Sequence, residues 1–180
     1  KNIFKILKKK NLIDQLIIEK DSGIYDAINK GINLSKGNYV GIIHAGDTYK
    51  NNIFLELSKY FNSKADIIYG LCELDFVSFS KIINLNKQSY KNLKEFMSIM
   101  HPSTFVNRTL YCKVGLYDKK FKVAGDFDFF HRSINKNYKF LFVNRVFTKM
   151  LYGGLSTKLS SLYLRAQENS QIILSKNNSV

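Results

Sequence analysis

Apolar residues recur with helical and strand-like spacing in turn along the first seventy positions of the chain. Apolar positions three and four apart predict helices over residues 2–10, 24–35 and 51–61. Short apolar runs predict strands over residues 13–18, 38–44 and 65–71. Gly37 is predicted to end the second helix. Alternating helices and strands favour βαβ units, and therefore an α/β fold with a mainly parallel sheet covered by helices.

The apolar pattern weakens after residue 71 and then returns. Two short β-like pieces, residues 74–79 and 103–107, flank a segment rich in lysine and asparagine. Beyond them the spacing predicts a helix over 125–136, one or two strands over 138–149 and a terminal helix over 157–175. The chain contains no internal repeat and no low-complexity linker, so residues 1–180 are predicted to form a single domain.

Length and composition indicate a globular protein. The chain has 180 residues, of which 45% are apolar, enough to bury a core without disulfide or metal staples. Its two cysteines, Cys72 and Cys112, lack the spacing of a zinc site, which favours a cytoplasmic location with reduced thiols. No apolar run approaches the ~20 residues of a membrane span, and residues 1–20 do not form a secretory signal. The chain begins at Lys1 rather than Met, which we interpret as the missing start of a longer protein.

The charge balance indicates an anionic partner. Lys and Arg number 28 against 14 Asp and Glu, which gives a net charge of +14. An excess of this size attracts nucleic acid, anionic lipid headgroups or phosphorylated small molecules. Charge alone does not choose among these classes, so the choice depends on motifs.

Four segments carry more specific information. They are Asp21–Gly31 (DSGIYDAINKG), Tyr39–Asp47 (YVGIIHAGD), His101–Val106 (HPSTFV) with Gly115–Asp118 (GLYD), and Gly125–Arg132 (GDFDFFHR). A further turn, Gly153–Ser156 (GGLS), follows them. In this order the segments resemble the family 2 glycosyltransferases, whose corresponding first motif reads DxGIYDAMNKG.

The resemblance implies both a fold and a reaction. The fold is GT-A, a Rossmann-like α/β architecture with a mainly parallel sheet and helices on both faces. The reaction moves a sugar from a nucleotide diphosphate donor to an acceptor hydroxyl, inverting by single displacement with metal assistance, in cell-surface polysaccharide or glycan synthesis. The family's opening strand and DGSTDGT-like segment have no counterpart here, so we expect a domain that is partial at its N-terminus.

Asp47 is the candidate metal ligand and, by the resemblance, also a donor-binding residue. The charge of a departing diphosphate must be neutralised, and Mg²⁺ or Mn²⁺ held by oxygen ligands does this. Asp47 follows an apolar strand, where ligands collect in open α/β sheets. Ala45 stands where the family has the first Asp of its DxD motif. An Asx-type turn is the alternative role for Asp47.

Asp126 is the candidate general base that removes the proton of the acceptor hydroxyl. It lies at a predicted helix start together with Asp128. Asp128 is four residues before Arg132, the spacing of a helix-surface ion pair, which leaves Asp126 free for the site. The motif alignment gives the same assignment. A helix N-cap is the alternative role for Asp126.

The segment around residue 21 is the candidate donor site. Asp21 and Gly23 precede a predicted helix N-terminus, which suits anions, and the resemblance places this segment along the donor. Asn29 is open between a structural and a donor-binding role. Asp26 is predicted to pair with Lys30 at helical spacing.

The three histidines are predicted to differ in role. His101 precedes Pro102, which favours extended backbone, and the resemblance places it on the acceptor or diphosphate side. His44, at a strand end, is expected to pack, and His131 is expected on a helix surface. None of them takes part in a zinc-like spacing.

Two alternative functions remain: a basic nucleic-acid-binding domain and an inactive glycosyltransferase fragment. Abundant Tyr and Phe and the positive charge favour the first. However, the lysines are scattered and most aromatic residues have core spacing, so nucleic acid is the less favoured partner. The partners we expect are a nucleotide-sugar donor, a glycan or lipid-linked acceptor, and an anionic membrane surface that would hold the protein peripherally at its cytoplasmic face.

Overall fold

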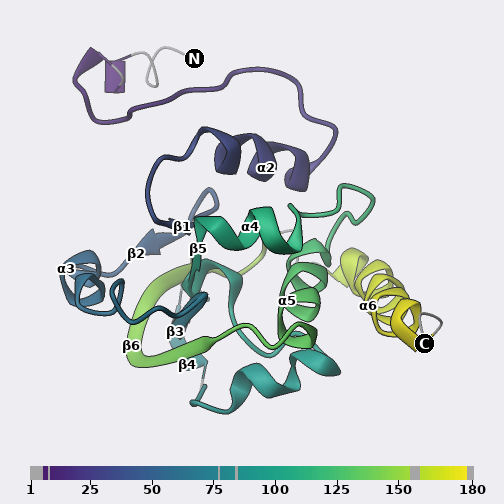
Figure 1. Ribbon diagram of the computed structural model, residues 1–180. Helices are drawn as coiled ribbons and strands as arrows, with labels where there is room; N and C mark the ends of the chain where they lie inside the picture. Colours follow the sequence, from purple (N-terminus) through teal and green to yellow (C-terminus); the bar gives the residue numbers. More distant parts are fainter. Residues whose placement is uncertain (1–5, 8, 77, 84, 155–158, 178–180) are drawn as a thin grey trace.

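A six-stranded sheet forms the centre of the computed structural model, which describes residues 6–7, 9–76, 78–83, 85–154 and 159–177 (Figure 1). The strand order is β1-β5-β3-β6-β2, and β4 pairs with β3 outside this path. The strands are β1 (Tyr39–Gly41), β2 (Thr48–Tyr49), β3 (Ile67–Asp75), β4 (Ser80–Ile83), β5 (Thr104–Asn107) and β6 (Phe140–Leu151). The α-helices include α2 (Ile24–Leu34), α3 (Ile53–Ser58), α4 (Arg108–Val114), α5 (Gly125–Asn135) and α6 (Leu162–Asn177). Short 3₁₀ turns are η1 (Ser89–Lys94), η2 (His101–Ser103) and η4 (Leu159–Ser161).

The α/β class is confirmed, but the sheet is mixed rather than mainly parallel. Within the described part of the chain only β3 and β6 pair in parallel, whereas β1·β5, β3·β5, β3·β4 and β2·β6 are antiparallel. Four residues, 76–79, connect β3 to β4, and so short a connection permits only an antiparallel hairpin. Apolar spacing within one strand carries no information on the direction of its neighbour, so the sequence pattern alone did not reveal this.

Helices cover both faces of the sheet, as expected. Side chains alternate between two cores along each central strand, as strand geometry requires. Ile67 and Tyr69 of β3 pack in the larger core with residues of α2, α4, α5 and α6. Ile68 of β3 and Phe105 of β5 face the opposite core, where Leu57 of α3 packs. The candidate site lies on the side of the larger core, because α2 and α5 carry two of its segments.

The predicted helices are largely confirmed, with differences at their ends. Helix α2 ends at Leu34, and the extended Ser35 terminates it, so Gly37 is not its stop. Helix α4 was not predicted, although the sequence contains its start signal. The Asn107 side chain accepts the Thr109 N–H at 3.0 Å, which caps the first turn.

The segment before α2 differs most from expectation. Residues 13–18 form no strand, and Ile17 and Ile18 are 40% and 50% exposed. A strand needs a neighbour to take its backbone hydrogen bonds, and this segment runs along the outside of α2, away from the sheet (Figure 1). Of the helix predicted over 2–10, the described residues 6, 7 and 9 are helical, and residues 1–5 and 8 lie outside the described part. Among the described residues, no helix combines the length and apolar character that a membrane crossing requires.

Candidate functional site

Tyr25 joins the start of α2 to the start of α5. Its hydroxyl lies 2.8 Å from the Val123 carbonyl oxygen and 3.3 Å from Asp126 Oδ1. A Cβ at Gly125 would come within 2.7 Å of the Tyr25 ring, so glycine permits this close approach. Two motif segments about a hundred residues apart in sequence therefore meet at one tyrosine.

Asp126 occupies the first turn of α5 and is partly buried. Its Oδ1 accepts the Phe127 N–H at 2.9 Å. Burial raises the pKa of this carboxyl to about 6. Hydrogen bonds from Phe127 and Tyr25 and the positive charge of Arg165 lower the pKa, but by less than burial raises it. The N-cap of α5 is Ala124, so Asp126 is not the N-cap considered as an alternative. A carboxylate with a pKa near 6 is largely ionised at pH 7 and more basic than an exposed one, which suits a general base.

Asp128 has the structural role predicted for it. Its Oδ2 lies 2.9 Å from both Nε and Nη2 of Arg132. The same guanidinium donates to the carbonyl oxygens of Val114 and Leu116. The ion pair thus ties α5 to the end of α4, and Asp126 is left on another side of the helix.

A second group of contacts connects α2 to His101. Asn29 donates from Nδ2 to the Tyr117 carbonyl oxygen at 2.8 Å, and its Oδ1 accepts the Tyr117 N–H at 3.1 Å. The Tyr117 hydroxyl lies 2.9 Å from His101 Nε2. Burial lowers the pKa of His101 to about 3, with a smaller contribution from nearby His44, so its imidazole is neutral at pH 7. Both amide groups of Asn29 are engaged, which favours its structural role, and its donor-binding role stays a prediction.

Asp47 lies beyond His44 on the same side of the sheet. The His44 and His101 rings have centroids 5.8 Å apart, and the Asp47 N–H donates to the His44 carbonyl oxygen at 3.0 Å. The Leu151 N–H, at the end of β6, donates to Asp47 Oδ1 at 3.1 Å. Burial raises the pKa of the Asp47 carboxyl, and it lowers that of His44. His44 is half-buried among these groups, which agrees with a packing role.

Asp47, His101 and Asp126 are therefore connected through neighbouring side chains. The connected row runs from Asp47 through His44, His101, Tyr117 and Tyr25 to Asp126. Its link between the two tyrosines is their stacked rings, whose centroids are 5.7 Å apart. Sequence reasoning missed the two tyrosines, although both lie inside quoted motif segments: Tyr25 in DSGIYD and Tyr117 in GLYD. The one signal in the sequence was the tyrosine hydroxyl itself, because a hydroxyl that becomes buried needs a polar partner.

Asp21 and Gly23 lie just before the N-terminus of α2. Lys30 Nζ contacts Asp21 Oδ1 at 2.8 Å, Glu19 Oε1 at 2.6 Å and Asp26 Oδ2 at 3.3 Å. The predicted pair of Asp26 and Lys30 is thus confirmed, as part of a larger cluster. A Cβ at Gly23, the N-cap of α2, would meet no atom within 4 Å, so the space beside it is open.

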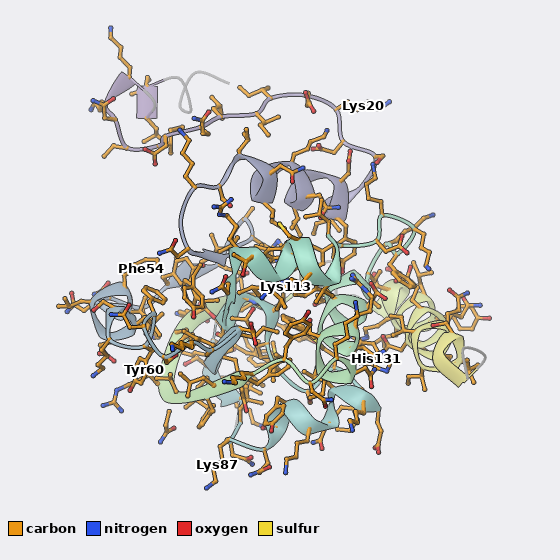
Figure 2. The ribbon with its side chains drawn as sticks, viewed as in Figure 1. Lys20, Phe54, Tyr60, Lys87, Lys113 and His131 are labelled. Atoms are coloured by element: carbon orange, nitrogen blue, oxygen red, sulfur yellow. The ribbon has the colours of Figure 1, made fainter. Side chains whose placement is uncertain are left out.

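His131 corrects the expectation of a surface residue. It is 5% exposed, and its ring lies 5.6 Å from that of Phe127. Figure 2 labels His131 beside α5. Helix α6 covers this side of α5, since Ile172 lines the same pocket as His131. The prediction failed because spacing within α5 could not show that a later helix packs there.

Asp47 stands in the turn directly before β2, and a single carboxylate there fits a Mg²⁺ or Mn²⁺ ion only if other ligands come from outside the protein. Among the described residues, no three His, Cys, Asp or Glu side chains gather as a metal site. Mg²⁺ commonly binds through one or two carboxylates and completes its shell with substrate phosphates and water. Asp47 fits that pattern, with Leu151 N–H holding one of its oxygens in place.

Comparison with known proteins finds relatives that are named glycosyltransferases. The chain is 27% identical over 126 residues to the "PGL/p-HBAD biosynthesis glycosyltransferase" of Mycobacterium bovis, covering 66% of this chain and 47% of the relative. It is also 27% identical over 147 residues to a Methanocaldococcus jannaschii protein named "Uncharacterized glycosyltransferase", covering 75% of this chain and 50% of the relative. The chain thus spans about half the length of these curated relatives. No protein-family model matches the sequence, so family 2 stays a prediction.

The fold is shared with Staphylococcus aureus TarS. Its structure in complex with UDP-GlcNAc superposes with a TM-score of 0.67 at 9% identity, covering 96% of this chain and 52% of TarS. The complex with UDP gives a TM-score of 0.61 at 10% identity, covering 97% and 57%. The chain therefore has a glycosyltransferase fold, and its relatives in sequence are named glycosyltransferases.

Proposed function

We propose that this chain forms the catalytic and acceptor side of a glycosyltransferase that moves a sugar from a nucleotide diphosphate donor to an acceptor hydroxyl. The observation that carries the proposal is the Asp126 carboxylate, held against Tyr25 with a pKa of about 6, on a fold shared with a UDP-GlcNAc complex. Sequence similarity to named glycosyltransferases supports the same class.

Asp126 is the base in this proposal. Its carboxylate takes the proton of the acceptor hydroxyl as that oxygen attacks the anomeric carbon, and the bond to the diphosphate breaks on the opposite face. The stereochemistry at that carbon is therefore inverted. Tyr25 holds the carboxylate by its hydroxyl, and neutral His101 keeps Tyr117 in place without adding charge. These contacts fix the base before substrate arrives, which reduces the cost of orienting it.

The donor lies along the start of α2 and the Asp47 turn. Gly23 leaves open space at the helix N-terminus, where backbone N–H groups suit an anion. Asp47 would hold Mg²⁺ or Mn²⁺, which supplies positive charge to the diphosphate oxygens. A glycan or lipid-linked acceptor, with the protein peripheral at the cytoplasmic face of an anionic membrane, completes the proposal.

Release of the nucleoside diphosphate tests this function. We expect the protein to release UDP, or another nucleoside diphosphate, from one of a panel of nucleotide sugars when glycan or lipid-linked acceptors and Mn²⁺ are present. Because the base must be ionised, kcat/KM should rise with pH through a midpoint near 6 and then level off. Absence of release across donors and acceptors, with the protein shown to be folded, would leave the inactive-fragment alternative.

A further inference from the structure

Helix α6 carries a buried acid that binds the backbone just before α5. Glu168 is 5% exposed. Its Oε1 accepts the Lys122 N–H at 2.8 Å, and its Oε2 accepts the N–H groups of Val123 and Ala124 at 3.0 and 2.8 Å. A buried carboxylate is stable only with such partners, and three backbone donors on one side chain are a specific arrangement.

The segment that Glu168 holds leads directly into the candidate base. Ala124 is the N-cap of α5, and its carbonyl oxygen accepts the Asp128 N–H at 3.0 Å. The Val123 carbonyl oxygen accepts the Tyr25 hydroxyl at 2.8 Å. Residues 122–124 are thus fixed from α6 by Glu168 and from α2 by Tyr25. Ala124 offers no side-chain cap, and Glu168, which accepts the Ala124 N–H, adds a carboxylate at this helix start to those of Asp126 and Asp128 in the first turn.

We infer that Glu168 is a positioning residue for Asp126: by holding residues 122–124 it fixes the depth and direction at which the Asp126 carboxylate faces the site. The catalytic meaning of this inference rests on the proposed function, whereas the contact itself does not. Without the Glu168 carboxylate, three backbone N–H groups would need water as their partner. Water entering there would reach the first turn of α5, where Asp126 lies.

The charged and titratable groups around Asp126 influence its pKa, which is the quantity that the test measures. Tyr25 faces it from α2, Tyr117 interacts with it from the loop before α5, and Arg165 of α6 lies one turn before Glu168. Burial is the largest cause of the raised pKa of Asp126. If the start of α5 opens to water, this burial decreases, and the pKa falls from about 6 towards the ordinary carboxyl value.

The test compares Glu168→Gln with Glu95→Gln, which removes an exposed acid just after η1. Carboxyl ¹³C NMR follows the titration of Asp126, assigned by its loss in Asp126→Asn, and amide hydrogen exchange is recorded at residues 122–124. In Glu168→Gln we expect the Asp126 midpoint to fall by about one pH unit or more, with exchange at 122–124 at least tenfold faster. The Glu95→Gln control should match the wild type in both. Faster exchange with an unchanged Asp126 midpoint would show that Glu168 supports the fold only, and would overturn the inference.

A second variant covers the case in which Glu168→Gln does not fold. Glu168→Asp keeps the carboxylate on a shorter stem, so a smaller fall of the midpoint is expected, and an unchanged midpoint in this folded variant overturns the inference. Neither measurement needs transferase activity, so failure of the proposed function is seen separately in the release assay. If the wild type is active, Glu168→Asp should lower kcat with donor affinity unchanged and shift the pH midpoint of kcat/KM in the same direction as the NMR midpoint.

Discussion

Two aspartates in the first turn of α5 differ in what surrounds them, and this difference assigns their roles. Asp126 contacts a tyrosine hydroxyl from another helix, whereas Asp128 is paired with Arg132 on its own helix. Two residues along a helix point about 200° apart, so they cannot both reach one acceptor hydroxyl. Asp126 is the better base of the two, because the Arg132 cation of the same helix is already paired with Asp128.

Asp126→Asn should separate activity from stability. We expect turnover to fall roughly a hundredfold or more, with donor binding nearly unchanged, because the base is lost. The pKa of Asp126 is raised from 3.8 to about 6 in the folded state. Between pH 3.8 and about 6, the folded state therefore keeps a proton that the unfolded state loses. Stability from this group is therefore lost as pH rises through 6, and the neutral Asn should raise the melting temperature at pH 7. Thermal melts at pH 5 and 7, beside steady-state kinetics, check both parts; a lower melting temperature at pH 7 would contradict the assigned burial.

Asp128→Asn is the matched change on the same turn. Asp128 is 14% exposed and Arg132 29%, so the pair is less exposed than sequence spacing indicated. We expect a loss of about 1–2 kcal/mol of unfolding free energy, larger than for a surface pair, while turnover falls little. Denaturant unfolding and kinetics of both variants decide. Loss of turnover in Asp128→Asn with an active Asp126→Asn would reverse our assignment of the base.

Asp47→Ala tests the predicted role of Asp47 as a metal ligand. If Asp47 holds Mg²⁺ or Mn²⁺ against the donor diphosphate, UDP should bind the wild type more tightly with the metal than without it. The variant should lose that difference and most activity. Isothermal titration of UDP with and without Mn²⁺ measures this, with Asp66→Ala as a control acid outside the site. Equal affinities in all four wild-type and Asp47→Ala titrations would contradict the metal role and leave Asp47 with a structural role, through its contacts to His44 and Leu151.

At the scale of elements, α2 is attached to the rest of the site through the Tyr25 hydroxyl and through the side-chain amide of Asn29. Asn29 is 8% exposed and bonds both backbone groups of Tyr117, whereas Asn33, one turn later, is exposed. Asn29→Ala leaves a buried N–H and carbonyl unpaired, so we expect a loss of about 2–4 kcal/mol, and Asn33→Ala should change stability by less than about 0.5 kcal/mol. Urea unfolding compares the two. Equal stability of both variants would mean that water replaces the amide at Tyr117.

The elements also show how far the sequence predicts this fold and site. Helices α2, α5 and α6 follow from their own apolar spacing, and the pair Asp128–Arg132 follows from helical geometry, because both are local. The antiparallel pairings and the burial of His131 depend on segments distant in sequence, which periodicity does not encode. Tyr25, His101 and Asp126 each lie in the first turn of their helix, which brings them together. Glu168 carried no signal in the sequence, because a single acid on a helix is typical of a solvent-exposed face.

At the scale of the whole molecule, the positive charge is spread rather than gathered in one stripe. Lys20 and Lys87 lie at opposite ends of the view in Figure 2. Of the exposed large aromatic residues, Phe54 lies on α3, Phe96 follows η1 and Tyr163 lies on α6, far from one another along the chain. Phe79 and Tyr152 both pack against Phe76 and form one small cluster beside β4 and the end of β6. Most other rings pack in the two cores. A nucleic-acid groove would require basic and aromatic side chains along one track, and this distribution does not favour it.

The last prediction therefore concerns the partner class. A spread charge of +14 attracts an extended anionic surface without reading bases, and each basic residue near such a surface contributes about 1 kcal/mol. We expect tighter binding to phosphatidylserine-containing liposomes than to a single-stranded oligonucleotide at about 0.15 M salt, with no binding to phosphatidylcholine liposomes as the control. Liposome co-sedimentation and fluorescence anisotropy measure the two affinities, and the liposome affinity should fall steeply with added salt. Tighter binding to the oligonucleotide, weakened by Phe54→Ala or Tyr163→Ala, would instead indicate base stacking and favour the nucleic-acid alternative.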